Sequence, residues 1–382
     1  MSAHEPLQAP AGAHSANAPT TVTTKKSKQR KVLLMGKSGA GKSSMRSIVF
    51  SNYVARDVRR LGATIDVEHS NIRFMGNLML NLWDCGGQDS FMESYLTSAH
   101  PHGGRGAGSG GQREHVFSNV AVLIFVFDVE SRDFQADVAN YGAVCRALGE
   151  NSREARVFVL LHKMDLVQVH LRERLFAERT ASVKRASESF EEGVQFFATS
   201  IWDQSLYKAW TAVIYTLVPN ATAIEMLMQK LARAMEAREL ILYERTTCLT
   251  ITTVTTESEQ GNPLNDRFER LSAILKTQKH SLAKHCRVPA SSAHFADLEI
   301  KTSRFMFFAC RLTENTNLAA VLPPSEMGFN AAKVAVGLAR SRFIELDTAT
   351  ASGKVRMSQE QFLAGAARDV MGGKEDQGDG MS

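Results

Sequence analysis

The chain has 382 residues, more than one hydrophobic core usually serves, so we expect two domains flanked by tails. Its 44% hydrophobic and 22% charged residues are typical of a soluble globular protein. The formal net charge of +5 arises near the start of the chain, where Glu5 is outnumbered by Lys25, Lys26, Lys28, Arg30 and Lys31. This is a basic tail rather than a basic face, so we expect no nucleic-acid partner. We expect this tail to be solvated and disordered; the alternatives are a nuclear-localisation signal or a segment that contacts anionic lipid.

The cysteines and the chain ends bear on the cellular compartment. Five scattered cysteines without a C-x-x-C pair indicate reduced thiols in a cytosolic protein: Cys85, Cys145, Cys248, Cys286 and Cys310. The chain has no run of 18 apolar residues, no glycine at position 2 for myristoylation, and no cysteine for prenylation near its final Gly-Met-Ser. We therefore expect no direct membrane insertion, and any membrane attachment would come from a partner.

Residues 31–220 are predicted to form the first domain, after a disordered tail over 1–30 that is rich in Ala, Pro, Ser and Thr. Short apolar runs alternate there with amphipathic stretches, at 31–35, 78–83, 120–127, 156–161 and 194–198. Near-continuous apolar strands separated by helices predict an α/β fold, a mostly parallel sheet with helices on both faces.

Two details refine this domain. Met45, Ile48 and Val49 form a helical stripe after the first strand, and residues 67–74 and 78–83 resemble a hairpin that adds an antiparallel edge. The glycine-rich stretch 101–113 is predicted to be a flexible insertion, with a partner-binding loop as the alternative.

Residues 221–347 are predicted to form a smaller α+β domain, followed by a disordered tail over 348–382. We expect a long helix over 222–244, a strand over 246–256, a helix near 268–282, strands within 294–322 and a last helix over 326–346. The long helix carries its apolar face on Ile224, Leu227, Met228, Leu231 and Met235. The domain shows no catalytic constellation, and its His280, His285, Cys286 and His294 match no zinc spacing.

Residues 36–43, G-K-S-G-A-G-K-S, follow an apolar strand and open a helix, as a phosphate-binding loop does. The glycines let backbone N–H groups turn toward the β-phosphate, Lys42 supplies a positive charge to the β- and γ-phosphates, and the Ser43 hydroxyl ligates Mg²⁺. The residues predicted to bind nucleotide here are Gly36, Ser38, Gly39, Gly41, Lys42, Ser43 and Ser44.

Residues 84–88, D-C-G-G-Q, end the strand over 78–83. Asp84 is predicted to hold Mg²⁺ through a water, the Gly87 amide to bond the γ-phosphate, and Gln88 to act in catalysis by orienting the attacking water. Upstream, Thr64 is placed to close over Mg²⁺ and the γ-phosphate. The alternatives are a helix cap for Asp84, a surface residue for Gln88 and a plain loop residue for Thr64.

Residues 162–165, H-K-M-D, indicate which nucleotide base the chain binds. The Asp165 carboxylate can accept the N1–H and 2-amino hydrogens of guanine, a pair that adenine lacks, while the Lys163 stem covers the ring. After the last strand, the Ser200 and Ile201 backbone is placed to meet the guanine carbonyl, with an ordinary helix cap as an equal alternative. The expected cofactors are GTP or GDP with Mg²⁺.

With these residues assembled, the chain closely resembles the Rag-type small GTPases of the A/B class. The resemblance rests on long passages at 31–48, 59–70, 80–93, 126–132, 162–167 and 199–210. It implies the phosphate and Mg²⁺ roles for Gly41, Lys42 and Ser43, the switch role for Thr64, γ-phosphate and hydrolysis roles for Asp84, Gly87 and Gln88, and base binding by His162, Lys163 and Asp165. His162 departs from the Asn of most GTPases but is similar to the Rag class.

The resemblance also implies a setting. It implies a carboxy-terminal roadblock-type domain and a heterodimer with a C/D-class Rag paralogue, with the contact expected at 222–244 and 246–256. It further implies a lipidated membrane scaffold, a GTPase-activating complex, and signalling of amino-acid availability to the TOR kinase complex. The protein would be cytoplasmic and recruited to the cytosolic face of the vacuolar or lysosomal membrane. A scaffold that binds GTP without hydrolysing it and a P-loop ATPase are the alternatives.

Overall fold

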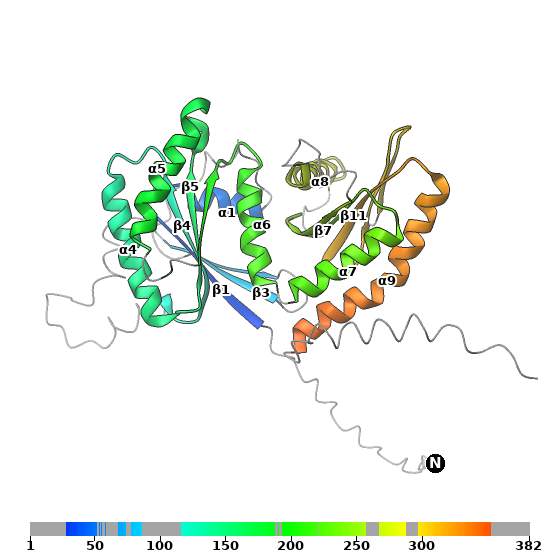
Figure 1. Ribbon diagram of the computed structural model, residues 1–382, viewed down its shortest axis with the longest axis horizontal. Helices are drawn as coiled ribbons and strands as arrows, with labels where there is room; N and C mark the ends of the chain where they lie inside the picture. The colour runs from blue at the N-terminus through cyan, green and yellow to red at the C-terminus, as the bar shows by residue number, and fades with distance from the viewer. Residues whose placement is uncertain are drawn as a thin grey trace, which may run out of the picture.

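A computed structural model describes residues 28–51, 53, 55, 58, 68–73, 78–85, 116–187, 190, 193–218, 220–256, 267–287 and 297–352. These residues form two sheets, each with its own helices, and α6 lies between the two sheets (Figure 1). Several predicted features lie outside the described residues. They are the glycine-rich insertion, Thr64, Gly87, Gln88, and the two predicted tails apart from residues 28–30 and 348–352.

The first sheet has six strands in the order β2-β3-β1-β4-β5-β6. Only β2 runs antiparallel to its neighbour β3, while the other pairs are parallel. The strands are β1 (Lys28–Met35), β2 (Glu68–Arg73), β3 (Leu78–Asp84), β4 (Val120–Asp128), β5 (Arg156–His162) and β6 (Val194–Thr199). The predicted parallel sheet and its antiparallel edge hairpin are therefore confirmed.

Helices cover both faces of this first sheet. On one face, α1 (Lys42–Phe50) and α6 (Ser205–Leu217) pack on alternate strand residues, and Met45, Ile48 and Val49 form the predicted buried stripe. On the other, α4 (Phe134–Asn151) and α5 (Arg172–Arg185) enclose a second cluster around the aromatic residues of β4. Two short 3-10 turns, η2 (Met164–Leu166) and η3 (Val169–Leu171), connect β5 to α5.

The second sheet has five antiparallel strands in the order β8-β7-β11-β10-β9. Its strands are β7 (Glu239–Glu244), β8 (Thr250–Thr255), β9 (Asp297–Lys301), β10 (Met306–Arg311) and β11 (Thr316–Leu322). The helices α7 (Ala221–Ala234) and α9 (Glu326–Ser352) lie on one face, and α8 (Arg267–His285) lies on the other (Figure 1). We call this sheet and its helices the second domain, and the six-stranded sheet and its helices the first.

Two predicted boundaries in the second domain were wrong. The helix expected over 222–244 ends at Ala234, and Glu239–Glu244 is the strand β7, because residues 240–243 are buried on both faces and pair with β11. The strand expected over 246–256 begins only at Thr250. The preceding residues form a turn in which the Glu244 carboxylate accepts hydrogen bonds from the N–H groups of Thr246 and Thr247.

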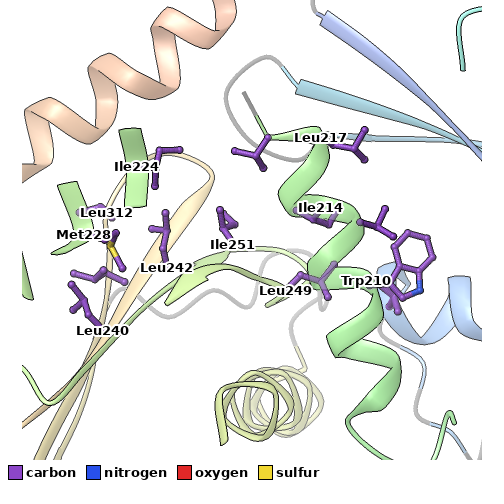
Figure 2. Close-up of a cluster of buried hydrophobic side chains, with 14 of the residues drawn as sticks. Trp210, Ile214, Leu217, Ile224, Met228, Leu240, Leu242, Leu249, Ile251 and Leu312 are labelled. Carbon is purple, nitrogen blue, oxygen red and sulfur yellow. The ribbon is translucent and has the colours of Figure 1, made fainter. Parts of the chain in front are cut away.

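One buried apolar cluster runs through both domains. Trp210, Ile214 and Leu217 of α6 belong to the same cluster as Ile251 on β8 and Met228 on α7 (Figure 2). This continuity means that the two domains share one hydrophobic core rather than meeting at a polar seam.

The remaining expectations concern the chain as a whole. All five cysteines are free, and only Cys286 is exposed. Within the described residues, no single helix is long and apolar enough to span a membrane; only α6 and α7 taken together reach that length and composition, and they are bent by 111° at the break between them. No group of three or more His, Cys, Asp or Glu residues that could hold a metal occurs in the part of the chain that the structure describes.

Candidate nucleotide-binding site

The loop between β1 and α1 has the backbone of a phosphate-binding loop. Gly36, Gly39 and Gly41 have φ angles of 137°, 79° and 95°, a region that side chains other than glycine rarely adopt. At Gly36 a Cβ atom would lie 2.2 Å from the carbonyl oxygen of Val126 on β4. The loop therefore rests directly on the central strand, and this close approach requires glycine.

Lys42 opens α1 and folds back across this loop. Its Nζ donates hydrogen bonds to the carbonyl oxygens of Gly36 at 2.8 Å and Lys37 at 3.0 Å. Burial lowers the pKa of Lys42, and the nearby Asp84 carboxylate opposes that shift. The ammonium group is thus held over the concave side of the loop. Ser38 is exposed on the loop and Ser44 is half-buried on α1.

Asp84 ends β3 beside the first turn of α1 and is completely buried. Burial raises the pKa of Asp84, while a hydrogen bond from Ser43 and the charges of Arg46 and Lys42 lower it. A carboxylate and a hydroxyl are the hard oxygen ligands that Mg²⁺ prefers, and a carboxylate retains acceptor sites beyond one hydroxyl and one cation. Ser43 and Asp84 therefore fit the predicted Mg²⁺ site.

Arg46 also contacts this site, although no sequence motif predicted it. Its guanidinium lies 3.3 Å from the Asp84 carboxylate, donates to the Ser70 hydroxyl at 3.0 Å and forms an ion pair with Glu68. Glu68 stands opposite Asp84 in the β2–β3 ladder, so only the strand pairing brings these charges together. Arg46 ties α1 to both strands of the hairpin.

The residues predicted to bind the base converge at the carboxyl ends of β4, β5 and β6. Lys163, with a φ of 65°, places its Nζ 2.6 Å from the Asp128 carboxylate. The Ser200 hydroxyl donates to the Asp165 carboxylate at 2.6 Å. The structure thus brings Lys163, Asp165 and Ser200 together and adds Asp128, which sequence reasoning missed although it lies in a family passage.

Ser200 has a role beyond the predicted one. Its N–H donates to the Ser205 hydroxyl at 2.9 Å, and its side chain holds Asp165 in place. Ser200 therefore positions the carboxylate that is predicted to bind the base. The backbone contact of Ser200 and half-buried Ile201 with the guanine carbonyl stays a prediction.

His162 lies under the phosphate-binding loop, a placement that grouping it with the base-binding residues did not anticipate. Its Nδ1 is 2.9 Å from the Thr199 hydroxyl, and a Cβ at Gly41 would lie 2.8 Å from its Cδ2 atom. The ring is buried and bridges β5, β6 and the last glycine of the loop. His162 therefore supports the phosphate loop from below.

The buried imidazole predicts a pH dependence of stability. Burial, with Lys163 as the next cause, lowers the pKa of His162 from 6.5 to about 4. The unfolded chain then binds a proton more readily than the folded one, so the contribution of His162 to stability is complete above pH 6.5 and is lost toward pH 4. We expect the unfolding free energy of the protein, relative to a His162→Asn variant, to fall by about 3 kcal/mol between pH 7 and pH 4.

Urea unfolding of both proteins across this pH range measures the difference. Asp84 and Glu244 titrate in both proteins, so their contributions cancel in the comparison. A difference that stays constant from pH 7 to pH 4 would show that the folded protein protonates His162 as easily as the unfolded chain.

Comparison with known proteins agrees with this geometry. Residues 31–275 match the family model described as the Gtr1/RagA G protein conserved region. The chain is 48% identical to GTP-binding protein gtr1 of Schizosaccharomyces pombe over 85% of this chain and 98% of that protein. It is 42% identical to Ras-related GTP-binding protein A of Dictyostelium discoideum over 85% of this chain and 100% of that protein.

A more distant group of relatives is also found. The chain is 25% identical to GTP-binding protein GTR2 of Saccharomyces cerevisiae over 56% of this chain and 58% of that protein. Two classes of paralogue therefore exist, and the identities place this chain with the first. The matched family model and these relatives, together with the glycine-rich loop and the buried Asp84, show that the chain belongs to the Gtr1/RagA family and is a guanine-nucleotide-binding Rag GTPase of the A/B class.

Proposed function

We propose that this GTPase works as a heterodimer with a C/D-class Rag paralogue and signals amino-acid availability to the TOR kinase complex. The observation that carries the proposal is the second domain, an antiparallel sheet joined to a nucleotide-binding domain, in which no described strand pairs with the outer side of the edge strand β9. We assign this domain to the roadblock type, whose function would be dimerisation. The existence of GTR2-like relatives supplies a class of partner.

The segments expected to contact a dimer partner, 222–244 and 246–256, already pack against other parts of this chain. The apolar face of α7, with Ile224, Met228 and Leu231, is buried in this chain's own core. Strand β8, the edge nearest the first domain, packs against α6. Because the most deeply buried apolar residues of these two surfaces serve the chain's own core, we place the contact at the opposite edge of the sheet.

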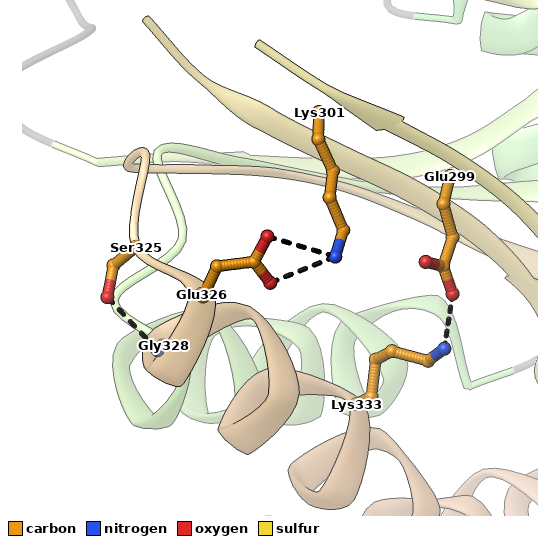
Figure 3. A network of polar contacts seen from close by, with 6 residues as sticks. All are labelled: Glu299, Lys301, Ser325, Glu326, Gly328 and Lys333. Carbon is orange, nitrogen blue, oxygen red and sulfur yellow. Dashed lines mark hydrogen bonds and ion pairs between the residues drawn. The ribbon is translucent and has the colours of Figure 1, made fainter. Parts of the chain in front are cut away.

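That opposite edge is β9. Glu299 and Lys301 point toward α9, where they form ion pairs with Lys333 and Glu326 (Figure 3). Side chains alternate along a strand, so Ile300 lies on the other face, the one covered by α8, and it is 45% exposed. Among the described strands, none pairs with the outer side of β9. An uncovered edge of this kind is a template for a partner strand.

The neighbouring helix α8 extends this surface. Ile274 is 54% exposed and Leu282 is also exposed, on the same side of the sheet as Ile300. We call Ile274, Leu282, Ile300 and the outer edge of β9 the β9–α8 surface. It combines backbone groups for strand pairing with apolar side chains for burial, which are the two components of a strand-and-helix dimer contact.

Co-purification with a C/D-class Rag paralogue tests this assignment. We expect Ile274→Glu to weaken the heterodimer by about tenfold or more, because it puts a charge into a buried apolar contact. The matched control is Val334→Glu on α9, which changes an exposed apolar helix residue of 63% exposure outside the surface. Loss of the heterodimer with the control variant alone would place the contact on α9, and no heterodimer with the unmodified chain would refute the proposed function.

The GTPase cycle is proposed to use the predicted switch residues. Thr64 and the Gly87 amide would close on the γ-phosphate, and Gln88 would orient the attacking water, while Ser43, Thr64 and Asp84 hold Mg²⁺, which neutralises charge on the phosphates when bound. The guanidinium of Arg46 is engaged by Glu68, Ser70 and Asp84 and is not free to stabilise the transition state. We therefore propose slow intrinsic hydrolysis that a GTPase-activating complex accelerates.

The location of the protein is likewise a proposal. We infer, from what membership of the Gtr1/RagA family implies, a cytoplasmic protein that a lipidated scaffold recruits to the vacuolar or lysosomal membrane. At that membrane the nucleotide state would set which surfaces the heterodimer presents.

A further inference from the structure

A buried lysine of the second domain contacts the helix that carries the phosphate-binding residues. Lys276 lies on α8, and its Nζ donates hydrogen bonds to the carbonyl oxygens of Ile48 and Val49, the second at 3.0 Å. Ile48 and Val49 are in the last turn of α1, which opens with Lys42 and Ser43. The contact therefore joins residues more than two hundred positions apart in the sequence and in different domains.

The contact satisfies groups that α1 cannot satisfy itself. The last carbonyl oxygens of a helix have no partner within the helix. The Ser47 carbonyl accepts from the N–H of Ser51, and the next two carbonyls are those that Lys276 reaches. A cation at this end also interacts favourably with the negative end of the helix dipole. Lys276 is thus the C-terminal cap of the helix, supplied by another domain.

The buried ammonium group of Lys276 needs well-placed acceptors for its hydrogen bonds. Lys276 is buried, and burial lowers its pKa to about 8. The Tyr207 ring of α6 lies 5.5 Å from its Nζ and adds a favourable cation–π contact. A buried charge is retained at a cost unless its partners are well placed, so two carbonyl acceptors and an aromatic ring indicate a specific site.

The position of α1 determines the position of the phosphate-binding groups. The helix has only nine residues, so it spans about 13 Å and moves as a rigid rod. Its first turn carries Lys42 and Ser43, its middle carries Arg46 against Asp84, and its last turn is held by Lys276. A shift at the last turn is transmitted to the first.

We propose that Lys276 is a positioning residue for the nucleotide site. By holding the C-terminal end of α1, it fixes the orientation of Lys42 and Ser43 and so makes nucleotide affinity depend on the second domain. This inference uses the guanine-nucleotide binding that the family membership establishes, and it does not depend on the heterodimer.

The same helix contains a matched control. Lys279, one turn further along α8, is also buried, and its Nζ donates to the backbone carbonyl oxygens of Thr246 at 3.0 Å and Arg245 at 3.5 Å. Both lysines are buried ammonium groups bonded to two carbonyls, but the carbonyls at Lys279 belong to the second domain itself. The two sites differ mainly in whether they touch α1.

The test measures the release rate of fluorescently labelled GDP from the full chain. We expect Lys276→Met to accelerate release by about tenfold, because a small displacement of positioning groups weakens several phosphate contacts at once. Lys279→Met should stay within about twofold of the unmodified chain, although thermal unfolding should show a comparable loss of stability for both variants.

Two results would overturn the proposal. One is an unchanged release rate in Lys276→Met; the other is equal acceleration in Lys279→Met, which would mean that general loosening of the second domain controls release. Lys276→Gln and Lys279→Gln, which retain a donor, repeat the comparison if the methionine variants do not fold. Faster release in Lys276→Gln than in Lys279→Gln supports the proposal, and equal rates refute it.

Discussion

The Asp165→Asn variant is expected to bind GDP about a hundredfold more weakly than the unmodified chain, or weaker still, because two hydrogen bonds to a charged acceptor are lost. The Ser200 hydroxyl, 2.6 Å from the Asp165 carboxylate, determines how the new amide is oriented. It donates a hydrogen bond, so the amide oxygen takes that position and the NH₂ group faces the base. Guanine presents two donors there, and donor then meets donor.

Calorimetric titration with GDP, xanthosine diphosphate and ADP measures the change. Xanthine has a carbonyl in place of the 2-amino group of guanine, so the variant should gain affinity for xanthosine diphosphate while it loses affinity for GDP. ADP binding should stay weak in both proteins. Unchanged GDP affinity in the variant would remove Asp165 from base recognition.

Gly36→Ala is expected to cost about 3 kcal/mol of folding stability or more, and nucleotide binding with it. The added Cβ would lie 2.2 Å from the Val126 carbonyl oxygen, and φ at this position is +137°. Val126 lies on β4, which is paired with β1 on one side and β5 on the other, so its backbone cannot move aside. The loop itself would have to lift off the sheet.

Gly39→Ala is the matched control for this prediction. Gly39 also has a positive φ, +79°, but a Cβ there meets nothing within 4 Å. Only backbone strain remains, and we expect a loss of about 1 kcal/mol. Chemical denaturation of both variants separates the two effects. Equal losses would mean that the contact with β4 is not what requires glycine at residue 36.

The first domain could be predicted from the sequence because its strands are near-continuous apolar runs. The β7 segment could not. Residues 236–239, E-A-R-E, favour a helix by local propensity. No proline or glycine separates them from the helical stripe that ends at Met235, so the sequence gives no signal that the helix stops there. The strand is fixed instead by pairing with β11, which is distant in the sequence, and with its hairpin neighbour β8. Tertiary contact overrides propensity at this boundary.

The site could be predicted only where its chemistry depends on consecutive residues. The phosphate loop with Lys42 and Ser43, and the base motif with Asp165, are local patterns with a local function. The contact of Arg46 with Glu68 and the hydrogen bond of Ser200 to Asp165 arise from strand order and from the meeting of strand ends, which spacing along the chain does not encode. His162 belongs to both groups, because its motif is local but its place beneath Gly41 is not.

The apolar cluster that continues from α6 into β8 and α7 limits how this protein can be divided. A fragment cut after Leu217 would expose to water the part of the apolar cluster on α6 that the second domain covers, a surface prone to aggregation. The complementary fragment would lose the side chains that cover Ile251. Each half would lack the side chains that cover its part of the shared core. Fusion partners are therefore better attached at the chain ends than between the two sheets, and the protein is not suited to being divided into two fragments there.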